Sequence, residues 1–135
     1  MKLVVDTNIL LVSISPRSSS NWLWQAILSG TYELYVTTDI LLEYMEIITQ
    51  KMGKEAAEIT IDLLSELPNV HFIQKYYFWQ LIEADPDDNK FLDCAIAAGA
   101  NYLVSNDKHF NVIKDYPYFK VKLVKFSEFQ SLFKK

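Results

Sequence analysis

Short apolar runs alternate along the chain with longer segments whose apolar residues recur at helical spacing. The first run, Lys2–Val5, is mostly apolar and ends at Asp6, which is typical of a strand covered on both faces. Further short apolar runs that are bounded by turn residues are predicted to be strands for the same reason. The predicted strands are Lys2–Val5, Leu34–Val36, Val70–Ile73, Tyr102–Val104 and Val121–Val124.

Polar and turn residues separate the segments that have helical periodicity. Pro16 and the serines of 18–20 stop one helix, and Ser29-Gly30 stops the next. Strands that alternate with helices indicate a parallel sheet between helical layers, which is the α/β class. The predicted helices are Thr7–Ser15, Asn21–Leu28, Thr38–Gln50, Glu55–Leu67, a helical turn region at Tyr76–Glu83, a helix from the Asp85–Asp88 turn to Ala98, and a short last helix capped by Ser127.

Length and composition fit one domain, residues 1–135. Half of the 135 residues are hydrophobic, which is enough for a sizeable core. The single cysteine, Cys94, excludes an internal disulfide, and with only two histidines a Cys/His zinc site of four ligands is excluded as well. Asp6 interrupts the apolar N-terminus, and no run approaches the length of a membrane span. We therefore expect a cytoplasmic protein with no membrane partner.

Charge is distributed unevenly. The net charge is −4, yet residues 108–135 contain seven lysines and only two acids. An acidic protein is a poor nonspecific DNA binder, because phosphate contacts need Lys and Arg. A lysine-rich segment beside carboxylates could meet phosphates while the carboxylates hold cations. It could equally be a solvated surface, and charge alone leaves both open.

Acidic residues fall where strands end and helices begin. Asp6 follows the first strand, Asp107 comes after Val104, and Asp88 opens a helix. Ligands of open parallel sheets bind beyond the carboxyl ends of the strands. Glu43 lies within a helix at the edge of its apolar stripe, where a carboxylate is costly to bury unpaired. Converging carboxylates repel one another, and Mg²⁺ or Mn²⁺ would relieve that repulsion.

Each acid also has an ordinary structural interpretation. Asp6 could cap a helix, Glu43 could be a surface residue, and the acids at 85–88 and 107 could belong to turns. Asp93 lies about 140° around the helix from Asp88, so it should face another way and could assist at the rim. Three polar side chains could orient carboxylates or waters, or satisfy turns: Thr7, Asn8 and Ser105.

The sequence lacks the motifs that several other kinds of catalytic site require. The three glycines are far apart, so no phosphate-binding loop exists, and no nucleophile elbow is present. Cys94 lies in an alanine-rich helix and reads as a small core residue. A phosphatase of the haloacid dehalogenase type needs an acid at Asn8, and a receiver domain needs a pair of acids where only Asp6 stands.

Three segments together resemble the PIN-domain family, and most of all its prokaryotic toxins of toxin–antitoxin pairs. They are VVDTNILL at the N-terminus, Glu43 in the helix after the second strand, and DPDDNKFLDCAIAAGANYLVSNDKHF. The resemblance implies a three-layer α/β/α Rossmann-like fold with a central parallel sheet. It also implies a ribonuclease that depends on Mg²⁺ or Mn²⁺ and hydrolyses RNA phosphodiester bonds.

The four acids of that family carry over to catalytic and metal-binding positions in this chain: Asp6, Glu43, Asp88 and Asp107. Ser105 stands where the family commonly has Thr, and Asn8 and Asp93 are supporting candidates. The third acid stays open between Asp88, Asp87 and Asp93, with Asp88 favoured by its distance from Ala95.

Partners follow from the same resemblance. Lys108 and His109 are candidates for binding the RNA backbone, an antitoxin protein is a further partner, and a homodimer is expected, with Trp22 and Trp24 at its surface. The alternative is a non-catalytic PIN-like interaction module. In that case the aromatic residues would form a partner surface. Otherwise Trp22, Trp24 and the run 76–79 are expected in the core or at a subunit interface, with a platform that stacks nucleic-acid bases as the minority alternative.

Overall fold

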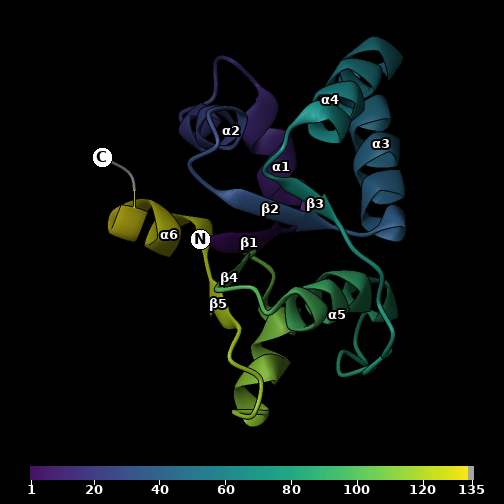
Figure 1. Cartoon of the computed structure of the whole chain (residues 1–135), viewed down its shortest axis with the longest axis vertical. Coiled ribbons are helices and arrows are strands. Elements are labelled where there is room, and N and C mark those ends of the chain that lie inside the picture. Colours follow the sequence, from purple (N-terminus) through teal and green to yellow (C-terminus); the bar gives the residue numbers. More distant parts are fainter. Residues whose placement is uncertain (134–135) are drawn as a thin grey trace.

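The computed structural model describes residues 1–133, and its five strands form one parallel sheet. The strand order is β3-β2-β1-β4-β5, with β1 in the centre (Figure 1). Leu3 of β1 is paired with Leu34 on one side and Tyr102 on the other. The predicted strands are confirmed, with ends that differ by at most one residue: β1 Lys2–Val5, β2 Glu33–Val36, β3 Val70–Phe72, β4 Tyr102–Val104 and β5 Lys122–Val124.

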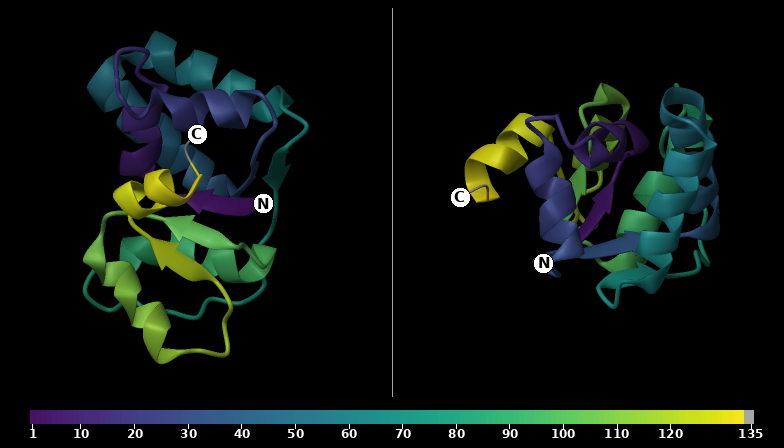
Figure 2. Two further views of the ribbon diagram at one scale, coloured as in Figure 1. Left: turned by 90° about the vertical axis from the view of Figure 1, so that its left-hand side faces the viewer. Right: turned by 90° about the horizontal axis from the view of Figure 1, so that it is seen from above.

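Helices cover both faces of this sheet. Helices α1, α2 and α4 lie on one side and α5 on the other (Figure 1), so the predicted α/β/α architecture is confirmed. Figure 2 shows α6 beside α2. The helices are α1 Thr7–Ile14, α2 Asn21–Leu28, α3 Thr38–Met52, α4 Lys54–Glu66, α5 Asn89–Ala98 and α6 Phe126–Phe133, with 3₁₀ segments η1 Pro86–Asp88 and η2 Lys108–Asp115.

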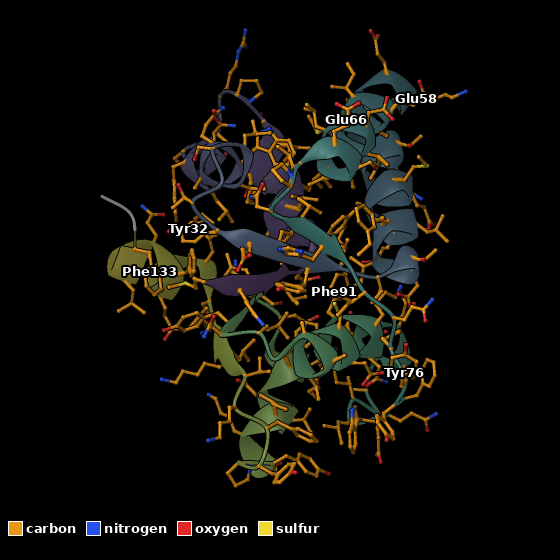
Figure 3. The ribbon with its side chains drawn as sticks, in the orientation of Figure 1. Tyr32, Glu58, Glu66, Tyr76, Phe91 and Phe133 are labelled. Carbon is orange, nitrogen blue, oxygen red and sulfur yellow. The ribbon has the colours of Figure 1, made fainter. Side chains whose placement is uncertain are left out.

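The core holds α3 and α5 against the end of β1. Phe91 of α5 is fully buried and lies between that helix and the sheet (Figure 3). It packs edge-on against Phe110 of η2, with ring centroids 6.4 Å apart. The buried Tyr44 hydroxyl of α3 donates a hydrogen bond to the Val5 carbonyl. Burial of each such ring stabilises the fold by about 1.5–3 kcal/mol, which keeps the strand end and its flanking helices in fixed positions.

The predicted helical turn region at Tyr76–Glu83 is wrong. This segment has no regular structure, because side chains of α5 satisfy its backbone. Asp93 accepts a 3.2 Å hydrogen bond from the Trp79 N–H. Asn89 bonds both the N–H and the carbonyl of Ile82, at 2.9 and 3.0 Å. These partners are distant in sequence, so local periodicity could not reveal them.

Of the two tryptophans expected at a dimer surface, one is buried in the core and the other is partly buried against it. Trp24 is buried, and Trp22 stacks on Phe129 of α6 with centroids 5.9 Å apart. Figure 3 shows Tyr32 and Phe133 in the same region, next to α6. The expectation of a dimer surface is therefore wrong for the buried Trp24 and stays a prediction for Trp22, while Cys94 is buried as predicted.

The last helix starts slightly earlier than the sequence predicts. Helix α6 begins at Phe126, one residue before Ser127, which was predicted to cap it. The Phe126 N–H donates a hydrogen bond to Asn106 Oδ1 at 2.9 Å. Within residues 1–133, every helix is too short or too polar to cross a bilayer.

Candidate functional site

The site lies where the chain changes direction in the sheet. From β1 the chain moves outward to β2 and β3 and then returns to β4 on the other side of β1. A crevice forms at such a switch point, beyond the carboxyl ends of the two central strands. The Asp6 N–H donates to the Val104 carbonyl at 3.0 Å, so Asp6 and Ser105 emerge side by side.

Asp6 is held rigidly at the end of β1. It is 8% exposed, and its Oδ1 accepts from the Thr7 N–H at 2.8 Å. Its Oδ2 accepts a hydrogen bond from the Ser105 hydroxyl at 2.7 Å. Burial raises the pKa of Asp6, these two hydrogen bonds oppose that rise, and the charges of Glu43 and Asp107 add to it. The carboxylate therefore has a fixed orientation and an unfavourable charge that a cation would stabilise.

Glu43 reaches the same crevice from α3. Its Oε2 accepts a hydrogen bond from the Thr7 hydroxyl, and its Oε1 lies 2.8 Å from Lys90 Nζ. Lys90 also contacts Asp87 at 2.8 Å, so one ammonium bridges two carboxylates. Burial would lower the pKa of Lys90, but its bonds to Asp87 and Glu43 outweigh burial and raise it. Glu43 therefore belongs to a polar network of Thr7 and Lys90.

Asp88 and Asp107 form the other half of the site with His109. The pKa of Asp88 is raised to about 7, by burial first and then by the charges of Asp85, Asp107 and Asp6, while His109 opposes the rise. His109 Nδ1 lies 3.6 Å from Asp88 Oδ2 and 3.4 Å from Asp107 Oδ1. Asp107 caps η2 by accepting from the His109 N–H at 2.9 Å. This cap places the imidazole between the two acids.

The donor set fits a hard divalent cation. Asp88 Oδ2 and His109 Nδ1 are buried, and neither has a hydrogen-bond partner among residues 1–133. Ligand atoms of Asp85, Asp88 and His109 lie within 4.8 Å of one another. Buried polar atoms without partners are rare in folded proteins and are often explained by an ion or water. Carboxylate oxygens suit Mg²⁺ and Mn²⁺.

The four predicted acids thus fall into two neighbouring groups. Asp88 and Asp107 flank His109, with Asp6 close enough to raise the pKa of Asp88. Glu43 approaches Asp6 from the other side, where its charge raises the pKa of that residue. Asp87 points away to Lys90, and its side chain is 69% exposed. The geometry thus brings Asp88, rather than Asp87, towards Asp6 and Asp107.

The supporting candidates are distributed around this crevice. Asn8 lines a hollow of about 360 Å³ together with Asp6 and Asp107. Lys108 is exposed beside Asp107. Asp93 is buried but faces the 73–85 segment, where it bonds the Trp79 N–H. Its position therefore separates it from the cluster of Asp6, Asp88 and Asp107.

Two members of the site were missing from the sequence interpretation in these roles. Lys90 forms ion pairs with both Glu43 and Asp87, but nothing in the sequence around Lys90 indicates that it contacts Glu43. Asp85, read as a turn residue, contributes to the cluster with Asp88 and His109. His109 was expected to contact RNA, and the structure places it against two carboxylates. The spacing of Asp85, Asp88 and Asp107 was the available signal, but only the fold shows that they converge.

The fold is similar to known structures of low sequence identity. A chain in the crystal structure of VapBC2 from Rickettsia felis bound to a promoter DNA fragment gives a TM-score of 0.63 at 20% identity, covering 93% of this chain and 98% of that one. VapBC-1 from nontypeable Haemophilus influenzae gives 0.61 at 17% identity, covering 94% and 99%. The PIN domain endonuclease Utp24 gives 0.54 at 11% identity, covering 92% and 84%.

The sequence comparisons show the family. No curated protein matches the chain. The family model described as PIN domain matches residues 2–109, which include all four acids of the crevice and both strands that carry its rigid members. The chain belongs to the PIN domain family.

Proposed function

We propose that this protein is a ribonuclease that depends on Mg²⁺ or Mn²⁺ and hydrolyses RNA phosphodiester bonds within a strand. The observation that carries the proposal is the convergence of Asp6, Asp88 and Asp107 at the ends of β1 and β4, with the pKa of Asp88 at about 7. Strongly perturbed carboxyl groups in a crevice are typical of catalytic sites. The fold it shares with the PIN domain endonuclease Utp24 supports the same activity.

Each residue of the crevice would have its own role in such a site. Asp6, Asp88 and Asp107 would hold the cation, with Glu43 completing the set. A bound divalent ion would lower the pKa of water and stabilise negative charge on the phosphate. The Ser105 hydroxyl fixes the orientation of Asp6, and the Thr7 hydroxyl fixes that of Glu43. Asn8, at the opening of the crevice, is placed to orient a water or a phosphate oxygen.

Cationic side chains next to Asp107 provide a path for the RNA backbone. Lys108, Lys114 and Lys125 line a small groove of about 80 Å³ that begins at Ser105 and Asp107. Ammonium groups bind phosphate through charge, and we assign contact with the RNA phosphates to these three. His109 Nδ1 would donate to a phosphate oxygen or share in binding the cation.

The biological role that we propose is that of the toxin in a toxin–antitoxin pair, acting in the cytoplasm with an antitoxin partner and as a homodimer. Its support is the likeness of the fold to chains of VapBC2 and VapBC-1. The alternative, a non-catalytic interaction module, predicts no metal response and no cleavage. Intact acids at every position of the crevice favour the enzyme.

The test is cleavage of mixed-sequence single-stranded RNA in Mn²⁺, Mg²⁺ or EDTA. Asp6→Asn and Asp88→Asn should abolish cutting, whereas Asp62→Asn, a charge-matched change on the exposed face of α4, should leave it intact. Cutting that survives Asp88→Asn would move the third acid to Asp87 or Asp93. Absence of both cutting and Mn²⁺ binding in the unaltered protein would establish the interaction module.

A further inference from the structure

A run of four aromatic residues, Tyr76–Trp79, lies on the surface beside α5. Tyr76, Tyr77 and Phe78 are 79%, 70% and 66% exposed. Figure 3 shows Tyr76 at the outer edge of the molecule beside α5. Contiguous exposed aromatic surface on a small protein marks an interaction site, because water contact with these rings is unfavourable. The run therefore needs an occupant.

The segment is held in place. Trp79 packs edge-on against Phe119 with centroids 4.9 Å apart, and its N–H is bonded by Asp93. Ile82, three residues on, is buried and bonded twice by Asn89. Between them Gln80 has a φ of 53°, a left-handed conformation that strains a residue with a side chain. The aromatic side chains are thus presented by an anchored backbone.

A cavity of about 710 Å³ is lined by Phe78, Gln80 and Ile82 of this segment together with Asp87, Lys90 and Asp93. Phe78 forms one wall and Lys90 another. The ammonium of Lys90 also contacts Glu43 at 2.8 Å, so Lys90 links the cavity to one of the proposed catalytic acids. A group bound in the cavity would therefore lie next to a phosphate bound at the acids. The volume is ample for one nucleobase, since ligand cavities commonly span about 300–1,000 Å³.

The charged side chains that line the cavity are four carboxylates, those of Asp39, Glu83, Asp87 and Asp93, and two lysines. Its two lysines are engaged, Lys75 with Asp39 at 2.6 Å and Lys90 with Glu43 and Asp87. Asp93 also lines the cavity and has no ion pair among the described residues; its bond is from the Trp79 N–H. Carboxylates accept hydrogen bonds from the exocyclic amines of bases. Adenine, cytosine and guanine carry such an amine, whereas uracil offers only its ring N–H.

We propose that Phe78 and the cavity beneath it form a subsite that binds one unpaired, amine-bearing base of the RNA, adjacent to the phosphate at the carboxylate cluster. The inference rests on the proposed ribonuclease function and adds to it a subsite for one base of the RNA. Aromatic platforms bind single-stranded nucleic acid because every base has a face that stacks. A base within a duplex cannot enter, since its faces and edges are occupied.

The test measures binding in EDTA, so that it does not depend on cleavage. Short labelled oligo(A), oligo(C) and oligo(U) RNA, and a hairpin duplex, are titrated with the protein by fluorescence anisotropy. We expect oligo(A) and oligo(C) to bind more tightly than oligo(U) and the duplex. Phe78→Ala should weaken binding about fivefold or more, the loss typical of one stacked base, whereas Phe78→Trp should retain it. Tyr118→Ala removes another exposed ring, one that lines a different hollow, and should leave binding unchanged.

Asp93→Asn provides a second variant with a distinct signature. Asparagine keeps the oxygen that accepts from Trp79 and replaces the other with an amide donor. The preference should then shift from oligo(A) and oligo(C) towards oligo(U). A change in base preference is a result that simple destabilisation would not produce.

Equal affinity of Phe78→Ala and the unaltered protein for oligo(A) would overturn the inference. So would a result in which Phe78→Ala changes the mass of the protein by light scattering but not its affinity for RNA, since the aromatic run would then be a protein interface. The proposed function fails separately. If Phe78 supports RNA binding but no metal gives cleavage, the subsite stands and the ribonuclease does not.

Discussion

The Ser105 hydroxyl donates a 2.7 Å hydrogen bond to Asp6 Oδ2 and accepts one from the Asp107 N–H at 3.0 Å. One side chain therefore links the end of β1 to the turn after β4, and both atoms of the hydroxyl are used. The link is buried at Ser105, so water cannot replace it. The position of Asp6 relative to Asp107 depends on this hydroxyl.

Ser105→Ala should therefore lower the free energy of unfolding by about 1.5–3 kcal/mol, the usual contribution of a hydrogen bond to a charged group. Ser105→Thr keeps the hydroxyl and should retain cleavage activity. The measurement is urea unfolding in EDTA. Ser65→Ala is the control, because Ser65 is exposed and bonds only its own helix, α4. An unchanged urea midpoint for Ser105→Ala would show that the link does not stabilise the fold.

Stability in the absence of metal should fall as pH rises towards 7. The pKa of Asp88 goes from 3.8 to about 7, so the folded protein holds a proton there that the unfolded chain has released. The stabilising effect of that proton is complete below pH 3.8 and is lost as pH rises through about 7. The raised pKa values of Asp6 and Asp93 act in the same direction, whereas Asp39, whose pKa is lowered, acts in the opposite one.

Asp88→Asn should make the decline with pH shallower and should be more stable than the unaltered protein above pH 7. Thermal unfolding between pH 4 and 8 in EDTA measures both effects. Asp62→Asn is the matched control, because it removes the same charge from an exposed position on α4. Parallel pH profiles for Asp88→Asn and the unaltered protein would contradict the assignment.

Sequence patterns predicted the strands well because β1 and β4 are buried on both faces, and continuous apolar runs record that burial directly. They failed at Tyr76–Glu83, where the aromatic residues at 76–79 are exposed and the backbone is bonded by Asp93 and Asn89 of α5. The acids Asp6 and Asp107 could be predicted from their places after strands. Spacing from Ala95 favoured Asp88 over Asp87, but it could not show their different surroundings, in which Lys90 contacts Asp87 and His109 lies beside Asp88.

Lys90 should stabilise the fold more than a lysine in an exposed ion pair does. Its side chain and that of Glu43 are largely shielded, and Lys90→Met would leave Glu43 with the Thr7 hydroxyl as its remaining partner. We expect a loss of unfolding free energy approaching the about 3–5 kcal/mol of a fully buried broken pair. Lys54→Met, which breaks the exposed pair of Lys54 with Glu58, should change stability by about 0–1 kcal/mol.

The Lys90 prediction has an internal check. Adding Glu43→Gln to Lys90→Met removes the uncompensated charge, so the double variant should recover part of the lost stability. Additive losses in urea unfolding would show that the two side chains do not interact energetically.

Addition of Mn²⁺ should raise the unfolding temperature of the unaltered protein, because a ligand that binds only the folded state stabilises it. The stabilisation should reach about 2.7 kcal/mol at a hundred times the dissociation constant. Asp88→Asn and Asp107→Asn should lose this response, since both remove carboxylates that flank His109. Asp87→Asn should keep it, because Asp87 faces Lys90, and Asp93→Asn should keep it, because Asp93 faces Trp79. The opposite pattern, with the response lost in Asp93→Asn and kept in Asp88→Asn, would place the cation on the side of α5 that faces the aromatic segment and would require a different set of catalytic acids.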